Sequence, residues 1–226
     1  MIIDITQTSS NVKQSYEIES EGLYYHAEAG RVSRMQSITL TNKTETVCGT
    51  YQISNFKNYI PFRYLFGTAN VTRCFYVSRN DEAIGNVVFS QHGFLKSFYL
   101  ISLYDDTCLR CYVVAKGSFQ YVCVYDYNYR NGEEKQIALI ETYLCVNDYK
   151  YTHKIYLLDD YKSWAFLLSF FTVYYSSYNF SERFHMSSGS VTEKRKTFSK
   201  YNDKYDPMWR EMNFPYENFF GKISLF

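Results

Sequence analysis

The segment from Ser163 to Phe180 contains no charged residue and neither Gly nor Pro. Nothing in the local sequence therefore interrupts a helix there. Just before it, Asp159 or Asp160 supplies an N-cap acceptor, and both carboxylates suit the positive end of the helix dipole. We predict a helix over residues 160–179.

This helix is apolar around almost its whole circumference. At about 100° per residue, one narrow stripe of small or polar side chains contains Ala165, Ser169, Thr172, Ser176 and Asn179. The large side chains that we expect at the structural centre of the fold are Trp164, Phe166, Leu167, Leu168, Phe170, Phe171, Val173 and Tyr174. Such a helix must be enclosed by protein or by lipid. Its apolar run is shorter than the roughly 20 residues that span a bilayer, so we expect protein to enclose it and no transmembrane span.

Most of the sequence before this helix has the pattern of β-strands joined by tight turns. The turn-forming segment Asn42–Glu45 separates two apolar segments, which predicts a hairpin. A weak repeat of strand, Asn/Asp/Gly turn and strand follows in residues 75–89, 99–114 and 122–140. The last strand before the helix is expected at residues 153–158. Consecutive hairpins make an antiparallel meander, so we predict a mainly β fold in which the sheet wraps around the buried helix.

The chain divides into three parts. Residues 1–33 are polar and mixed, and we expect a loosely attached N-terminal arm with room for one short strand. Residues 34–186 hold the hairpins and the helix, and residues 55–66 within them have the composition of a connection with a short helical turn. Residues 187–226 form an extension that is either mobile or packs back on the sheet. Packing on this chain or on a partner is favoured by its apolar residues Trp209, Met212, Phe214, Phe219 and Phe220.

Composition narrows the classes of function. A chain of 226 residues suits one domain, and 25 Tyr and 18 Phe favour strands over disorder. The formal net charge is +1, so no global field recruits nucleic acid, and we expect no nucleic-acid partner. No basic segment followed by an apolar segment opens the sequence, so we expect a cytoplasmic protein with its 6 cysteines reduced.

We expect no catalytic residue, no metal and no cofactor, because the short motifs of nucleophilic, nucleotide-binding and metalloprotease sites are absent. Cys108 and Cys111 have the spacing of half a zinc site, but no second ligand pair exists. The segment Asp126–Glu134 lacks the ligands of a calcium loop and is interpreted as a hairpin turn. A hydrolase assembled in space remains a third alternative, and it would need a histidine and a carboxylate within hydrogen-bond reach in a deep polar cavity.

One segment has the chemistry of an anionic-lipid site. Basic residues interleaved with aromatic ones follow Glu193, and the lipid-headgroup candidates are Lys194, Arg195, Lys196 and Lys200. A basic segment gains about 1 kcal/mol per charge near an anionic membrane. Glu193, Asp203 and Asp206 dilute this charge, and a solvated linker is the alternative interpretation.

The order of hairpins followed by one uncharged helix resembles the tubby C-terminal-like superfamily. More narrowly, residues 75–89, 99–114, 122–140 and 164–178 are similar to its LURP-one-related and phospholipid scramblase-like branch, which has bacterial members. The resemblance covers about half the chain. It implies a closed antiparallel β-barrel of about twelve strands around the C-terminal helix. The extension after residue 187 departs from the family pattern, in which the helix lies near the end.

The resemblance also implies a function. Tubby proteins bind phosphoinositide headgroups through basic residues, but no motif here aligns with those residues. We expect a non-enzymatic binding module that recognises a lipid headgroup, a small ligand or a protein, at the cytoplasmic membrane surface or in the cytoplasm. The alternative is a structural or assembly protein that uses its aromatic C-terminal extension to associate with itself or a partner. The oligomeric state stays open.

Overall fold

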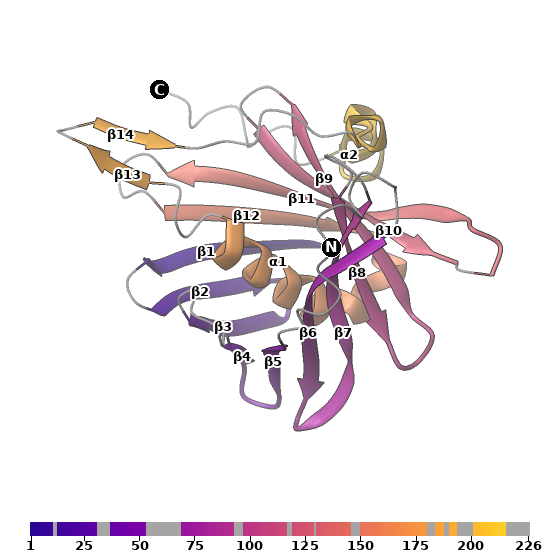
Figure 1. Ribbon diagram of the computed structural model, residues 1–226, viewed down its shortest axis with the longest axis horizontal. Coiled ribbons are helices and arrows are strands. Elements are labelled where there is room, and N and C mark those ends of the chain that lie inside the picture. Colours follow the sequence, from indigo (N-terminus) through magenta and orange to yellow (C-terminus); the bar gives the residue numbers. More distant parts are fainter. Residues whose placement is uncertain are drawn as a thin grey trace.

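The computed structural model describes residues 1–10, 13–30, 37–52, 69–92, 97–116, 119–128, 130–145, 150–179, 184–187, 190–193 and 201–215. Twelve antiparallel strands in this part close into a barrel (Figure 1). They are β1 (Ile2–Ser10), β2 (Lys13–Ser20), β3 (Leu23–Gly30), β4 (Ser37–Thr41), β5 (Thr46–Gln52), β6 (Ala69–Arg79), β7 (Glu82–His92), β8 (Ser97–Leu103), β9 (Cys108–Lys116), β10 (Phe119–Tyr127), β11 (Glu134–Cys145) and β12 (Lys150–Leu157). Each strand pairs with its neighbour in sequence, and β1 pairs with β12, which closes the sheet.

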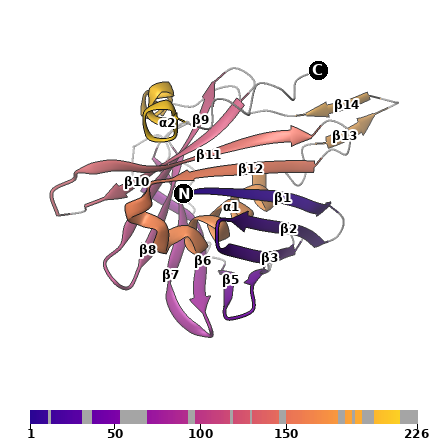
Figure 2. The same ribbon diagram turned by 180° about the vertical axis from the view of Figure 1, so that it is seen from behind.

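The helical and peripheral elements follow the last barrel strand. They are the 3₁₀ helix η3 (Asp159–Trp164), helix α1 (Ala165–Asn179), the two-stranded ribbon β13 (Phe184–Ser187) and β14 (Ser190–Glu193), the 3₁₀ helix η4 (Asn202–Lys204) and helix α2 (Pro207–Asn213). Seen from both sides, α1 runs inside the ring of strands, whereas α2 lies outside it (Figures 1 and 2). The prediction of a mainly β fold, a closed barrel around a buried helix, is confirmed. No described helix has the length and apolar character needed to cross a membrane.

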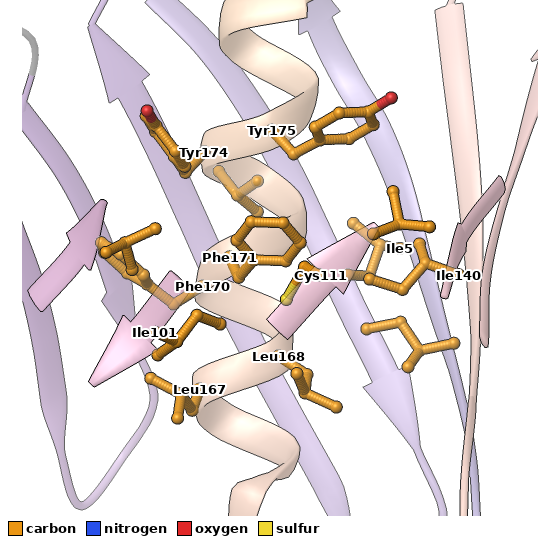
Figure 3. Close-up of a cluster of buried hydrophobic side chains, with 14 of the residues drawn as sticks. Ile5, Ile101, Cys111, Ile140, Leu167, Leu168, Phe170, Phe171, Tyr174 and Tyr175 are labelled. Atoms are coloured by element: carbon orange, nitrogen blue, oxygen red, sulfur yellow. The ribbon is translucent and has the colours of Figure 1, made fainter. Parts of the chain in front are cut away.

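The two sides of helix α1 pack against different parts of the sheet, so both sides are buried. It approaches β1–β4 and β12 most closely. Two of the buried side chains there, Ala27 and Ala29 of β3, are small, among larger ones such as Ile5 and Ile38. The aromatic residues of α1 meet those of the strands: the ring centroids of Tyr174 and Phe75 are 4.6 Å apart, and those of Phe171 and Tyr99 are 5.4 Å apart. Phe171 and Tyr174 are among the side chains of α1 in the close-up of the core (Figure 3).

Of the eight helix side chains that are predicted to lie at the centre of the fold, six are buried in the core and two are not. Leu167, Leu168, Phe170, Phe171 and Val173 are fully buried, and Tyr174 is 1% exposed. Trp164 belongs to η3, and Trp164 and Phe166 are only partly buried at the edge of the core. The guanidinium carbon of Arg79 lies 4.5 Å from the centre of the Phe166 ring, which covers this edge.

The start of the helix differs from the prediction. Regular α-helix begins at Ala165, and residues 159–164 form a 3₁₀ turn with a kink at Tyr161. The N-cap position is Leu158, without a side-chain cap, so neither Asp159 nor Asp160 caps the helix as expected. The carboxylate of Asp159 instead accepts from the Met1 amine at 2.8 Å, and the ammonium of Lys162 lies 3.3 Å from it.

The expectation of a loosely attached arm over residues 1–33 is wrong. Residues 2–10, 13–20 and 23–30 form β1, β2 and β3, and β1 closes the barrel by pairing with β12. The reason is a period-two pattern among the polar residues: Ile3, Ile5, Tyr16 and Ile18 all point inward with 0% exposure. The barrel unit therefore begins at the first strand and not at residue 34.

The turns of the predicted hairpins are confirmed where the structure describes them. Asn42 accepts from the amides of Thr44 and Glu45 at 2.8 Å, which closes the turn between β4 and β5. The turn residues Asn80, Asp81 and Asp106 have the positive φ that tight turns require. The helical turn expected at residues 55–66 lies outside the described residues.

Candidate functional site

One group of polar side chains lies inside the barrel, beside the C-terminal half of α1. The Nε2 atom of His153 is 2.8 Å from the Ser176 hydroxyl, and its Nδ1 atom is 3.0 Å from the Thr142 hydroxyl. The Tyr16 hydroxyl donates to the Gln14 side-chain carbonyl at 2.6 Å and lies 3.2 Å from the Ser176 hydroxyl, from which it can accept. This network satisfies polar groups in an otherwise apolar interior.

The His153 network has the properties of a packed core and not of a reaction centre. Burial lowers the pKa of His153 to about 3, so the imidazole is neutral at pH 7. Burial also raises the pKa of Tyr16 far above its ordinary value. The His153 side chain is only 1% exposed, which leaves a substrate no direct access to it.

A second histidine forms a pair with a carboxylate on the outer face of β2 and β3. The Nδ1 atom of His26 is 2.9 Å from a carboxylate oxygen of Glu17, and the hydroxyl of Tyr24 also donates to Glu17. Burial alone would raise the pKa of Glu17, but hydrogen bonds from Tyr24 and His26 hold it below its ordinary value. His26 is 40% exposed on the sheet surface, and the pair is not in the deep cavity that a hydrolase requires.

The outer face of β9–β12 carries the most elaborate arrangement of charged and aromatic groups. Residues 201–214, which we call the strap, cross this face. The ring of Tyr201 lies 4.8 Å from that of Tyr112, and Tyr205 stacks on Tyr121 at 4.4 Å. Trp209 of α2 is 9% exposed and belongs to an outer apolar cluster with Val114, Cys123, Leu139 and Tyr156. The strap is therefore packed on the barrel, as one of the two sequence expectations had it.

Glu134 of β11 is the first charged centre under the strap. Its carboxylate is 2.8 Å from Arg110 Nη1, 2.5 Å from the Tyr112 hydroxyl and 2.6 Å from Lys204 Nζ. Burial alone would raise its pKa, but the hydrogen bonds from Lys204, Tyr112 and Arg110 lower it. The Arg110 guanidinium also stacks at 3.5 Å from the centre of the Tyr127 ring.

Glu141 of β11 is the second charged centre. Arg210 Nη1 donates to its two carboxylate oxygens at 3.0 and 3.1 Å, and the Tyr143 hydroxyl also donates to it. The side chain of Glu141 is only 5% exposed. Arg210 also lies 5.6 Å from the centre of the Tyr156 ring. The two carboxylates therefore face two cations of the strap.

A shallow hollow lies where the end of the strap meets the start of the chain. It measures about 330 Å³ and is lined by Met1, Ile2, Leu158, Asp159, Asn213, Phe214 and Pro215. Its lining is mostly apolar. Asp159 is the acidic group of this lining, and its carboxylate is already bonded to the Met1 amine.

The lipid-headgroup candidates Lys194, Arg195, Lys196 and Lys200 all lie outside the described residues. Lys204, four residues after Lys200, forms an ion pair with Glu134. Glu134, Glu141 and Arg210 are site residues that the sequence pattern does not predict. The only local signal for Glu141 is a charged residue within an apolar strand, which indicates a partner but does not identify it.

The cysteine and acidic-loop candidates behave as the sequence indicates. Cys111 is buried in the core, whereas Cys108, three residues earlier on β9, is on the other face and partly exposed. The Asp126–Glu134 segment is the turn between β10 and β11, closed by a bond from the Asn128 amide to the Glu133 carbonyl. Among the described residues, no cluster of three or more metal-binding side chains occurs.

The fold and these sites have no matched relative from which a role could be transferred: no protein-family model, curated protein or solved structure matches the chain.

Proposed function

We propose that this chain is a non-enzymatic binding module of the tubby and LURP-one-related type, which recognises its ligand on the outside of the barrel. The single observation that carries the proposal is that α1 fills the interior, with Leu167, Phe170 and Phe171 at 0% exposure. Small barrels that hold a ligand leave their interior open for it. A barrel filled by its own helix offers a ligand its outer surface and its ends.

Anionic lipid headgroups are the ligand class that we propose. The sequence holds one run of three consecutive basic residues, Lys194–Lys196. It lies between β14, which ends at Glu193, and the strap, which begins at Tyr201. In contrast, the strap cations Lys204 and Arg210 are neutralised by carboxylates. The basic run therefore carries the proposed contact.

Co-sedimentation with phosphatidylcholine vesicles, with and without a phosphoinositide, tests this function. The variant Lys194→Ala/Arg195→Ala/Lys196→Ala should bind the phosphoinositide vesicles roughly a hundredfold more weakly, because three charges contribute about 1 kcal/mol each. The control, Lys13→Ala/Lys43→Ala/Lys162→Ala, loses the same charge from surface positions and should bind as the wild type does. Equal pelleting of the wild type and the first variant excludes this lipid site.

Assembly through the C-terminal extension is a second candidate function. The observation in its favour is that the strap, which belongs to this extension, binds the outer face of the barrel. It forms two ion pairs there, and Trp209 is buried against β9–β12. Deleting residues 187–226 should then change the mass measured by light scattering in any solution where the full chain associates. An unchanged mass in such a solution removes this role.

A further inference from the structure

The strap provides a full set of complementary groups for the outer face of the barrel. Apart from its aromatic contacts, the Asn202 side chain accepts from the Ala115 amide at 3.2 Å, and the Tyr125 hydroxyl donates to the Lys204 carbonyl at 2.8 Å. The strap partners of these groups are 87 and 79 residues away in sequence. The strap is thus far in sequence from the barrel strands whose outer face it covers.

The outer face of β9–β12 contains two largely buried carboxylates, and the segment that covers it must supply cations to pair with them. Glu134 and Glu141 are 12% and 5% exposed with the strap in place. Glu134 keeps Arg110 as a partner when the strap leaves, but Arg210 is the cation that faces Glu141. A partly buried carboxylate without its cation is unfavourable. The face therefore fits a segment that presents a tryptophan and cations at the spacing of Lys204, Trp209 and Arg210.

We propose that this face also accepts the strap of a second copy of the chain, in a reciprocal exchange that joins two barrels. This inference deepens the assembly function above by naming the partner and the contacts. A second copy brings the same residues at the same spacing, so an exchanged pair keeps every strap contact that one chain makes with itself. Residues 194–200 connect β14 to the strap in each copy.

The covalent connection between the barrel and the strap decides whether the strap packs on its own barrel or on the barrel of a second copy. The chain between Asn179, where α1 ends, and Tyr201 ties the strap to its own barrel, and a covalent connection of this kind gives the strap an effective concentration of up to about the millimolar range. In dilute solution the strap therefore closes on its own barrel, and exchange becomes favourable where chains are locally as concentrated, as on a shared surface. Variants that cannot close on themselves should exchange at far lower concentration.

Charge complementation between two full-length variants tests the proposal. Glu141→Arg places two cations together within one chain, and Arg210→Glu in the other variant places two carboxylates together. In an exchanged pair, the arginine introduced at position 141 of one chain meets the glutamate introduced at position 210 of the other, and the native Glu141–Arg210 pair forms at the second face. The readouts are mass by light scattering and the emission of Trp209, measured in a Trp164→Phe background.

Equimolar mixing should convert the two variants into a species of twice the 26.9 kDa chain mass, with the Trp209 emission returning to shorter wavelength. The control chain with both Glu141→Arg and Arg210→Glu restores the pair within itself and should stay monomeric with a buried Trp209. A mixture that keeps the mass and emission of the separate variants overturns the proposal. So does a control chain that remains as perturbed as the single variants, because the ion pair would then not seat the strap.

If circular dichroism shows that charge reversal unfolds the barrel, Glu141→Gln and Arg210→Gln form a milder pair. Each alone removes one charge of the ion pair, and the exchanged pair contains one neutral and one native contact. Here too, a doubled mass and a restored Trp209 emission on mixing support the exchange, and an unchanged mass and emission overturn it. Because deletion of residues 187–226 removes every role of the extension, an altered mass on deletion without complementation would retain assembly and reject exchange of the strap.

Discussion

Replacing Gly49 of β5 with alanine is the sharpest mutational probe of a helix inside the barrel. A Cβ atom at this position would lie 2.2 Å from Cζ and 2.8 Å from Cε2 of Phe170 on α1, and 3.2 Å from Cδ1 of Phe75. The two distances to Phe170 are far inside van der Waals contact, and the distance to Phe75 is tighter than an ordinary contact. Phe170 is fully buried and Phe75 is 1% exposed, so neither ring has free space into which it can move.

The expected cost of Gly49→Ala is about 3 kcal/mol in the free energy of unfolding, at the upper end of overpacking effects. Urea denaturation followed by circular dichroism measures it. For a domain of this size, such a loss corresponds to a melting temperature lower by roughly 6–12 °C. In β3, Gly30→Ala is the matched control, because its nearest neighbour would be the Ser37 carbonyl at 3.7 Å, an ordinary contact.

A double-mutant cycle locates the effect. Phe170→Leu removes the ring edge that the new methyl group would meet, so Gly49→Ala should cost at least about 1 kcal/mol less in the Phe170→Leu background than in the wild type. If Gly49→Ala changes the unfolding free energy by no more than the Gly30→Ala control, or if the two changes are additive, then Phe170 does not lie against Gly49 and the placement of α1 is incorrect.

Three further predictions concern other parts of the fold. Burial lowers the folded-state pKa of His153 to about 3, so below about pH 6.5 the unfolded chain binds a proton that the folded chain does not. The free energy of unfolding should therefore fall by up to about 1.4 kcal/mol per pH unit on acidification. Urea titrations at pH 7 and pH 5 should show a smaller loss of unfolding free energy for His153→Gln than for the wild type, and an equal loss in both proteins would contradict this. Gly85→Ala would bring a Cβ to 2.2 Å from the Ser102 carbonyl oxygen and 2.8 Å from the Leu103 backbone. It should therefore destabilise the barrel by more than the control Gly132→Ala, which places a Cβ in open space at a residue with a positive φ. Equal melting temperatures of the two variants would refute the close approach of the strands at Gly85. Trp209→Ala removes the buried ring of the strap, which should cost about 3 kcal/mol and release the strap. Limited proteolysis would detect the release as cleavage within residues 201–214 with the barrel intact, whereas an uncleaved strap would show that Trp209 does not hold it.

The sequence contains enough local information to predict the hairpins and α1. The turn chemistry of Asn42 and Asp106, and the absence of charge from Ser163 to Phe180, each act over a few residues. The first three strands are harder to predict, because their inward residues alternate with many polar ones and their turns are short. Ile3 and Ile5 carry the necessary signal, but only the pairing of β1 with β12, more than 140 residues away, shows why they are inside.

The candidate sites depend on contacts that no sequence pattern encodes. His153 and Ser176 come together because β12 and α1 pack against each other, and Lys204 reaches Glu134 across 70 residues. A charged residue within an apolar strand indicates that a partner exists. The identity of the partner is fixed by the closed shape of the barrel and by the path of the strap, and both are properties of the tertiary structure.

The central claim is that α1 is enclosed by the strands of the barrel, and a nuclear Overhauser measurement tests it directly. With Phe170 selectively labelled, its ring protons should show strong cross-peaks to the α-protons of Gly49 and to the ring of Phe75, since all three meet in the interior. Cross-peaks from Phe170 to water or to other helices, with none to Gly49, would contradict the enclosed helix.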